Sequence, residues 1–172
     1  MHPILKCLSA AALQHTITMK TADSRTSIKA GATGEILRSC LLTRTRQISR
    51  VLTALYDDAL RPFGINAPQL TLLVMIHELG PIGRAALGRR NHHDRSTLTR
   101  NLQPLLAQGW IVEGPPDEDG RTRPLAVTSL GRTLLRDAAP AWSVAQTKAT
   151  AMLGGSSVEA IMDIGRRLPG PR

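Results

Sequence analysis

Apolar residues recur at helical spacing over the stretch that follows Glu35. The positions on this stripe are Leu37, Leu41, Ile48, Leu55 and Ala59. Intervals close to 3.6 residues predict one long amphipathic helix over residues 35–60. Cys40 also fits this stripe, because it lies about one turn after Leu37.

A second helix follows a break in the pattern. The pair Phe63-Gly64 interrupts the first helix. Asn66-Ala67-Pro68 is typical of a new start, because proline lacks only an N–H group that the first turn leaves unpaired. From Leu70 to Leu79 the chain is apolar nearly all round, which predicts a buried helix that ends at Gly80-Pro81.

Two shorter helices, separated by a polar turn, come next. The first is predicted over residues 82–90, the turn is Asn91-His92-His93, and Asp94 is suited to cap the second helix. The inward positions of the second helix are leucines: Leu98, Leu102 and Leu105. Its outer positions carry hydrogen-bonding side chains: Arg95, Ser96, Thr97, Thr99, Arg100 and Gln103. Pro104 falls beyond these outward-facing turns, so a kink there is tolerable.

The β signal is confined to two short runs near the middle of the chain. Trp110-Ile111-Val112 and Leu125-Ala126-Val127 predict the strands of a hairpin, with Asp119-Gly120 at its tip. Arg121 and Arg123 lie two residues apart, so both guanidinium groups can leave the hairpin on one side. Asp119 is suited to hold Arg121 by a charge-assisted hydrogen bond.

Helices resume after the hairpin. Ser129 is predicted to cap a helix that begins at Leu130, and Pro140 to kink this helix by removing one backbone hydrogen bond. A last helix is predicted to begin with a capping box formed by Ser156 and Glu159.

This order of elements predicts a mainly α fold with a small β-hairpin wing, that is, a winged helix-turn-helix domain. A helix fits the major groove of B-DNA, where each base pair has a distinct pattern of donors and acceptors. An extended hairpin can place arginine in the minor groove. The outer positions of the helix after Asp94, together with Arg121 and Arg123, are therefore candidate DNA contacts. The alternative for each of them is a solvated surface position.

The charge distribution indicates a polyanionic partner. The 172 residues include 22 Lys/Arg and 13 Asp/Glu, for a formal net charge of +9. Five arginines and one acid fall in residues 81–104. Aromatic residues make up only 2%, which argues against a platform that stacks RNA bases. Charge alone also suits a non-specific architectural DNA-binding protein, and that alternative stays open, as does RNA binding.

The first third of the chain differs from the rest. Residues 1–34 are rich in Ser, Thr, Ala and Gly and keep no helical period, which predicts a poorly ordered arm. Its apolar piece, residues 4–13, is only weakly similar to an export signal. Cys7 and Cys40 cannot form a disulfide scaffold, and no apolar run is long enough to cross a bilayer. We therefore expect a cytoplasmic protein.

Motifs for catalysis and metal binding are missing from the sequence. It contains no Gly-rich phosphate loop, no nucleophile elbow and no zinc-protease helix. His92 and His93, with His77, make a poor metal site, because adjacent histidines on a turn seldom point at one ion. We predict that the protein is not an enzyme and uses no cofactor and no metal.

Several ordered segments resemble the multiple antibiotic resistance regulator (MarR) family. They are residues 60–73, Arg95-Ser96-Thr97-Leu98-Thr99-Arg100, Gly109-Trp110-Ile111, Asp119-Gly120-Arg121 and residues 125–131. The resemblance extends from about Glu35 to the C-terminus. It implies a winged-helix homodimer that binds a pseudo-palindromic operator. Such a protein usually represses transcription until a small, often phenolic, ligand or an oxidant releases it.

The resemblance also implies how the chain is divided. After the arm, residues 35–66 would form a first dimerisation helix and its connection, residues 67–128 the DNA-binding lobe, and residues 129–172 the C-terminal dimerisation helices. Candidates to line an effector cavity between arms and lobe are Tyr56, His77 and Trp142. The alternative for Tyr56 and Trp142 is an ordinary core position.

Two positions carry further expectations from the resemblance. Cys40 falls where peroxide-sensing relatives carry a reactive cysteine, and the alternative is a buried structural cysteine. The family usually has a Leu-Gly-hydrophobic turn before the recognition helix, whereas this chain has Asn91-His92-His93. We therefore expect a looser turn or a displaced helix start.

Overall fold

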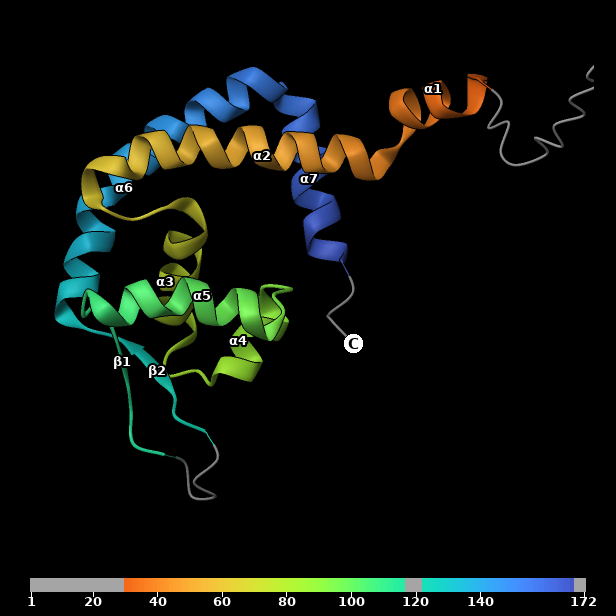
Figure 1. Cartoon of the computed structure of the whole chain (residues 1–172). Helices are drawn as coiled ribbons and strands as arrows, with labels where there is room; N and C mark the ends of the chain where they lie inside the picture. Colours follow the sequence, from red (N-terminus) through yellow and green to blue (C-terminus); the bar gives the residue numbers. More distant parts are fainter. Residues whose placement is uncertain (1–29, 117–121, 169–172) are drawn as a thin grey trace, which may run out of the picture. The chain divides into compact units, whose positions relative to one another are not determined.

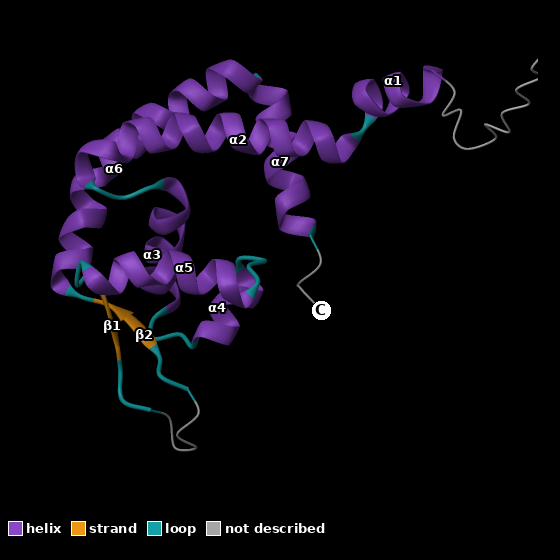
Figure 2. Ribbon diagram, in the orientation of Figure 1, coloured by secondary structure: helices purple, strands orange, loops and turns teal. Residues whose placement is uncertain are grey.

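The computed structural model describes residues 30–116 and 122–168 (Figure 1). The described part of the chain divides into two units between Leu41 and Leu42. Most of the described residues lie in helices, and the two strands form one small antiparallel sheet (Figure 2). The predicted fold class, mainly α with a β-hairpin, is confirmed.

The first predicted helix is two helices. Helix α1 covers Ala30–Ser39 and helix α2 covers Leu41–Leu60, with the break at Cys40. The prediction of one continuous helix over residues 35–60 is therefore wrong. Residues 30–34, predicted to belong to a poorly ordered arm, form the first half of α1.

The break after α2 and the start of the next helix are as predicted. A short 3₁₀ helix, η1 (Arg61–Phe63), ends at Gly64, whose φ of 68° suits glycine. Helix α3 covers Ala67–Leu79 and begins with a capping box, in which Asn66 and Gln69 each accept a backbone N–H of the other. Its buried positions are Leu70, Leu72, Leu73 and Ile76, whereas Val74 is 41% exposed. The helix is therefore buried on one side only.

The next two helices confirm the predicted helix–turn–helix order. Helix α4 covers Arg84–Arg90 and helix α5 covers Arg95–Ala107. Helix α4 begins two residues later than predicted, because Ile82 pairs with the second strand of the hairpin instead. Pro104 lies inside α5 without ending it.

The hairpin consists of β1 (Ile111–Glu113) and β2 (Leu125–Val127), paired with Ile111 opposite Val127. Trp110 precedes β1 and is buried. The first strand is thus shifted by one residue from its predicted range.

The C-terminal helices begin differently from the prediction. Helix α6 covers Ser129–Leu153, and its cap is Thr128, not Ser129, because the Thr128 hydroxyl accepts the Gly131 N–H at 3.1 Å. Pro140 lies inside α6, which changes direction along its length (Figure 1). Helix α7 covers Gly155–Arg167 and has no side-chain cap. The predicted Ser156–Glu159 capping box is wrong, because the helix begins one residue before Ser156.

One apolar core joins the helices from the end of α2 to α6 with the hairpin. Helices α3, α4 and α5, the hairpin and the start of α6 supply most of it, and α2 adds Leu60. The fully buried leucines are Leu60, Leu72, Leu73, Leu87, Leu102, Leu105 and Leu125. Among the described residues, none of the helices has the length and apolar character needed to span a membrane.

Candidate nucleic-acid interface

Asp94 fixes the start of α5. One of its carboxylate oxygens accepts the Thr97 N–H at 2.9 Å and the Ser96 hydroxyl at 2.6 Å, and the other accepts the Thr97 hydroxyl at 2.7 Å. These bonds, the Ser96 one foremost, hold the pKa of Asp94 well below its usual range. The predicted cap is confirmed, and α5 starts directly after the turn.

The turn between α4 and α5 closes through backbone hydrogen bonds. The Asn91 N–H donates to the Leu87 carbonyl and the His93 N–H to the Gly88 carbonyl, both at 3.0 Å. His92 takes a φ of 51°, the only positive φ of a non-glycine residue in the described ranges. Helix α5 begins at Arg95, directly after the predicted cap. His92 takes a left-handed conformation that is uncommon for a residue other than glycine. A turn looser than the family's stays a prediction.

Five of the six predicted outer positions of α5 are exposed. Its exposed side chains are Arg95, Ser96, Thr99, Arg100 and Gln103, opposite the buried Leu98, Leu102 and Leu105. The hydroxyls are engaged locally, since Thr99 donates to the Arg95 carbonyl at 2.8 Å and Ser96 and Thr97 donate to Asp94. Thr97 is also half-buried, so it supports the cap rather than the outer face. The side chains that remain free to bind a ligand are thus the guanidiniums of Arg95 and Arg100 and the amide of Gln103.

Helix α4 adds basic groups that sequence reasoning had counted only as net charge. Arg89 and Arg90 are exposed in the last turn of α4, directly before the Asn91–His93 turn. Guanidinium groups bind phosphate bidentately, so both are candidate backbone contacts. The signal that could have found them is their place beside the turn that leads into α5.

The hairpin is only partly described. Arg123 is exposed, and the Gly114 N–H donates to the Pro124 carbonyl at 2.7 Å, which extends the pairing beyond β1 and β2. Arg121 lies outside the described residues, and so does Asp119, its predicted partner. Both roles stay predictions.

The base of the hairpin is tied to the start of α4. Ile82 and Leu125 exchange two backbone hydrogen bonds, of 3.1 and 2.9 Å. The Arg84 Nε and Nη2 both donate to Glu113 Oε1, at 3.1 and 2.5 Å. The hairpin therefore has a side-chain and a backbone link to the helix pair.

A cavity of about 500 Å³ lies among α2, α3 and α6. Its lining is Tyr56, Leu60, Ala67, Leu70, Thr71, Val74, Met75, Leu135, Ala139 and Trp142. None of these side chains carries a charge. Two of the predicted cavity residues, Tyr56 and Trp142, are therefore part of a cavity.

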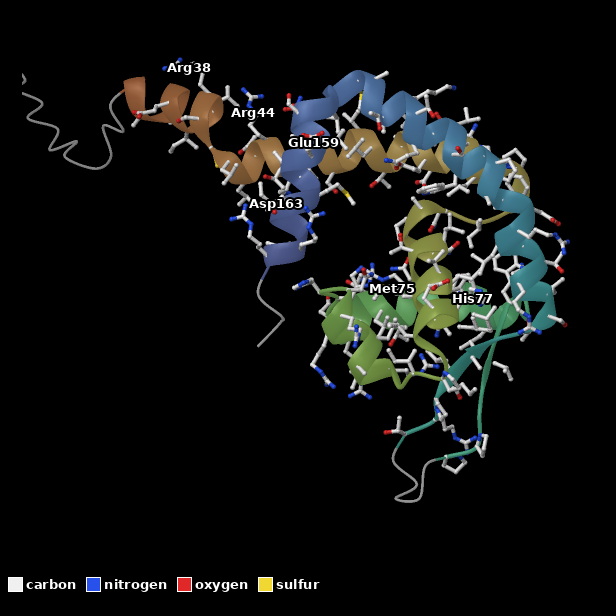
Figure 3. All side chains as sticks on the ribbon, turned by 180° about the vertical axis from the view of Figure 1, so that it is seen from behind. Arg38, Arg44, Met75, His77, Glu159 and Asp163 are labelled. Atoms are coloured by element: carbon white, nitrogen blue, oxygen red, sulfur yellow. The ribbon has the colours of Figure 1, made fainter. Side chains whose placement is uncertain are left out.

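The polar edge of this cavity includes Tyr56. Its hydroxyl donates to Gln146 Oε1, and burial raises its pKa. Trp142 is 45% exposed, so it is not a core residue of the described chain. His77 was predicted to line the cavity and does not. It is exposed on α3, two residues after the cavity residue Met75 and therefore on another face of the helix (Figure 3).

Cys40 lies between α1 and α2 and is half-buried. Its N–H donates to the Ile36 carbonyl at 2.9 Å. Cys40 was predicted to lie on the apolar stripe of one continuous helix. This is wrong, because the helix is interrupted at Cys40. A redox role for Cys40 stays a prediction. In the described ranges, no three His, Cys, Asp or Glu side chains gather where they could hold a metal ion.

Comparison with known proteins gives this arrangement its family. The model of the MarR family matches residues 63–122, from η1 into the hairpin. The uncharacterized HTH-type transcriptional regulator YwoH of Bacillus subtilis (strain 168) is 25% identical over 88 residues, which are 51% of this chain and 64% of that protein. The match thus spans just under two thirds of this curated relative.

Solved structures match over more of the chain. The M. tuberculosis transcriptional regulator MosR, in complex with DNA, is 31% identical, covers 75% of this chain and 99% of its own, and superimposes with a TM-score of 0.64. A mutant of MarR from E. coli, complexed with operator DNA, is 21% identical and has a TM-score of 0.69. The match covers 78% of this chain and 98% of the MarR chain, and it shows a shared fold. With the family model and MosR in agreement, the chain belongs to the MarR family.

Proposed function

We propose that this protein is a transcriptional regulator, a repressor, that binds double-stranded DNA in a sequence-specific manner. The observation that carries the proposal is the outer face of α5. It presents Arg95, Arg100 and Gln103 from a helix whose start is fixed by Asp94 and whose opposite face is buried. A side chain that reads bases must be exposed and able to hydrogen-bond, and its helix must be held rigidly.

The surroundings of α5 suit a DNA duplex. Arg89 and Arg90 flank the turn before α5 and supply phosphate contacts, while Arg123, with Arg121, supplies wing contacts along the minor groove. The DNA complex of the related MosR supports this proposal. A DNA-binding regulator acts where the chromosome lies, which in a bacterium is the cytoplasm.

The proposed active form is a homodimer on a pseudo-palindromic operator. Helices α2, α6 and α7 leave large apolar side chains exposed, among them Val51, Val144, Met152 and Met162. Where such side chains form one patch, the patch is typical of a subunit interface. In the dimer the two α5 helices would enter successive major grooves, about 34 Å apart.

The cavity among α2, α3 and α6 is the proposed effector site. Its volume suits a small organic molecule, and Tyr56 and Trp142 supply aromatic surface for a phenolic ring. The cavity lies where α2 and α6 meet the lobe helix α3. A bound ligand would therefore favour some orientations of the lobe relative to the arms over others. Release from DNA then follows from a population shift toward spacings that do not fit two grooves.

The test begins with selection of bound sequences from random duplex DNA by the purified full-length protein. Arg100→Ala is expected to weaken binding to the selected sequence by about 1–3 kcal/mol and to relax specificity at one position. Arg50→Ala on α2 removes the same charge outside the helix-turn-helix and the hairpin and serves as the matched control. Loss of equal size on selected and random DNA would make Arg100 a phosphate contact.

Two outcomes would overturn the proposal. Selection that yields no preferred sequence, with a steep dependence of affinity on salt, indicates an architectural protein. Stronger binding to single-stranded RNA than to duplex DNA indicates an RNA-binding protein.

A further inference from the structure

Three consecutive residues before and at the start of α4 hold the base of the hairpin. Ile82 pairs with Leu125 through two backbone hydrogen bonds. A Cβ added at Gly83 would lie 2.7 Å from Thr122 Cγ2, so a larger residue here would require the Thr122 side chain to move. Arg84, the first residue of α4, binds Glu113, the last residue of β1.

The Arg84–Glu113 contact is the side-chain part of this link. Two guanidinium nitrogens, Nε and Nη2, share one carboxylate oxygen, and the side chains are 38% and 32% exposed. Glu113 is also opposite Leu125 in the hairpin. The ion pair therefore ties α4 to the same rung of the sheet that Ile82 reaches through Leu125.

Arg84 differs from the other arginines of residues 81–104. Arg89, Arg90, Arg95 and Arg100 are exposed, and within the described ranges none of these four has an ion pair. Arg84 is half-buried, and its charge is neutralised by Glu113. A guanidinium that is already paired with a carboxylate binds phosphate poorly, but it can hold the hairpin against α4.

The hairpin needs this support from α4 because its own strand pairing is short. Each strand has three residues, and a two-stranded hairpin is only marginally stable by itself. Arg123 lies two residues before β2, so a small rotation at the base of the hairpin moves its guanidinium relative to α5.

We infer that Arg84 and Glu113 are positioning residues that set the orientation of the wing relative to α5. The inference rests on the proposed DNA-binding function. The pair acts through Arg123, and neither of its members touches the DNA.

The first test follows backbone amide hydrogen exchange in the free full-length protein. Arg84→Gln and Glu113→Gln are each expected to speed exchange at Gly114 and Leu125 about threefold to fivefold, with the buried turns of α5 unchanged. The charge-swapped double variant, Arg84→Glu with Glu113→Arg, is expected to restore slow exchange. Unchanged exchange in both single variants would overturn the inference, whatever the protein binds.

The second test measures affinity for a duplex selected by the wild-type protein. Each single variant is expected to bind about threefold to fivefold more weakly, and the charge swap to recover affinity to within about twofold. Weak binding by the swapped variant, with slow exchange restored, would show that Arg84 contacts phosphate directly, and would overturn the inference. Arg136→Gln is the matched control, because it breaks an exposed ion pair, Arg136–Asp137, on α6 and outside the proposed DNA-binding surface.

Coupling to Arg123 separates positioning from general destabilisation. Arg123→Ala is expected to weaken binding less in the Glu113→Gln background than in the wild type, because the misplaced wing has already lost that contact. An equal penalty in both backgrounds would contradict the inference. If selection yields no preferred duplex, the proposed function fails, while the exchange measurements still decide whether the pair holds the wing.

Discussion

The lobe and the helical arms of this protein bury their apolar residues in different ways. In the lobe, α3, α4, α5 and the hairpin close around leucines that are fully buried within one chain. In the arms, α7 has no buried residue, and α2 contributes only Leu60. The large apolar residues exposed on the arms include Ile48, Val51, Val144, Met152, Ile161, Met162 and Ile164.

This difference indicates which part of the molecule is stable without a second chain. A lobe with its own core needs no second chain, whereas arms with exposed apolar side chains gain stability only by covering them. The buried positions of α6 beyond the lobe are small, Ala145 and Ala149, so they add little to a core. We therefore expect changes in the lobe to act on folding and changes in the arms to act on association.

The largest effect is expected from the lobe core. Leu102→Ala removes a side chain that is 0% exposed and leaves a cavity between α5 and its neighbours. The free energy of unfolding should fall by about 2–5 kcal/mol, as measured by urea denaturation with far-UV circular dichroism. The loss should be the same at low and high protein concentration. A loss that vanishes at high concentration would mean that the lobe, too, depends on association.

The next effect is expected from the arms. Met162→Asp places a charge on the exposed apolar face of α7, where Met162 is 58% exposed. Dimerisation, measured by sedimentation velocity, should weaken at least about tenfold, because the carboxylate must be desolvated in the interface. Helix content at low concentration should not change. Ser157→Asp, on the same helix, is the control, and an unaltered dimer in Met162→Asp would exclude this face from the interface.

The lobe was predictable from the sequence and the arms were less so, for a physical reason. The inward leucines of α5, the Asp94 cap and the strand Leu125–Val127 follow from local periodicity and capping chemistry. The break at Cys40 leaves no mark in the apolar spacing, and Thr128 caps α6 through its bond to Gly131, beside the Trp110 carbonyl. Neither feature can be predicted from the spacing of hydrophobic residues.

In the candidate site, too, features set by local spacing were predictable and features set by tertiary packing were not. The exposed face of α5 followed from helical spacing, and it was found as predicted. His77 was assigned to the cavity as a polar-tipped residue, but the face of α3 toward the cavity is set by packing against α2 and α6. The Arg84–Glu113 pair joins residues 29 apart in the sequence, and no local signal links them.

A smaller effect tests the junction of lobe and arms. Ala139→Phe fills part of the cavity from α6, where Ala139 is exposed and lines the opening. Binding of a neutral apolar dye such as Nile red, followed by its fluorescence, should weaken about fivefold relative to the wild type. The melting temperature should change little, because Ala139 is outside the core. Equal dye binding by both proteins would place the apolar binding site elsewhere.

The smallest effect compares two caps, Asp94 at the start of α5 and Thr128 at the start of α6. The pKa of Asp94 is lowered in the folded protein, so the folded state binds fewer protons than the unfolded state, in which an aspartate titrates near 3.9. The stabilisation from the charged cap is therefore complete above about pH 5 and decreases as the pH falls through 4. The stability difference between wild type and Asp94→Asn should shrink on acidification, since asparagine does not titrate.

Thr128→Ala supplies the matched control for this last prediction. Its hydroxyl caps α6 and binds the Gly109 carbonyl at 2.7 Å, and neither bond involves a titrating group. The stability that this variant loses should therefore stay constant from about pH 6 to about pH 3, measured by urea denaturation at each pH. If the Asp94→Asn difference also stays constant, the carboxylate caps α5 by geometry alone. The start of the DNA-facing helix would then owe nothing to its charge.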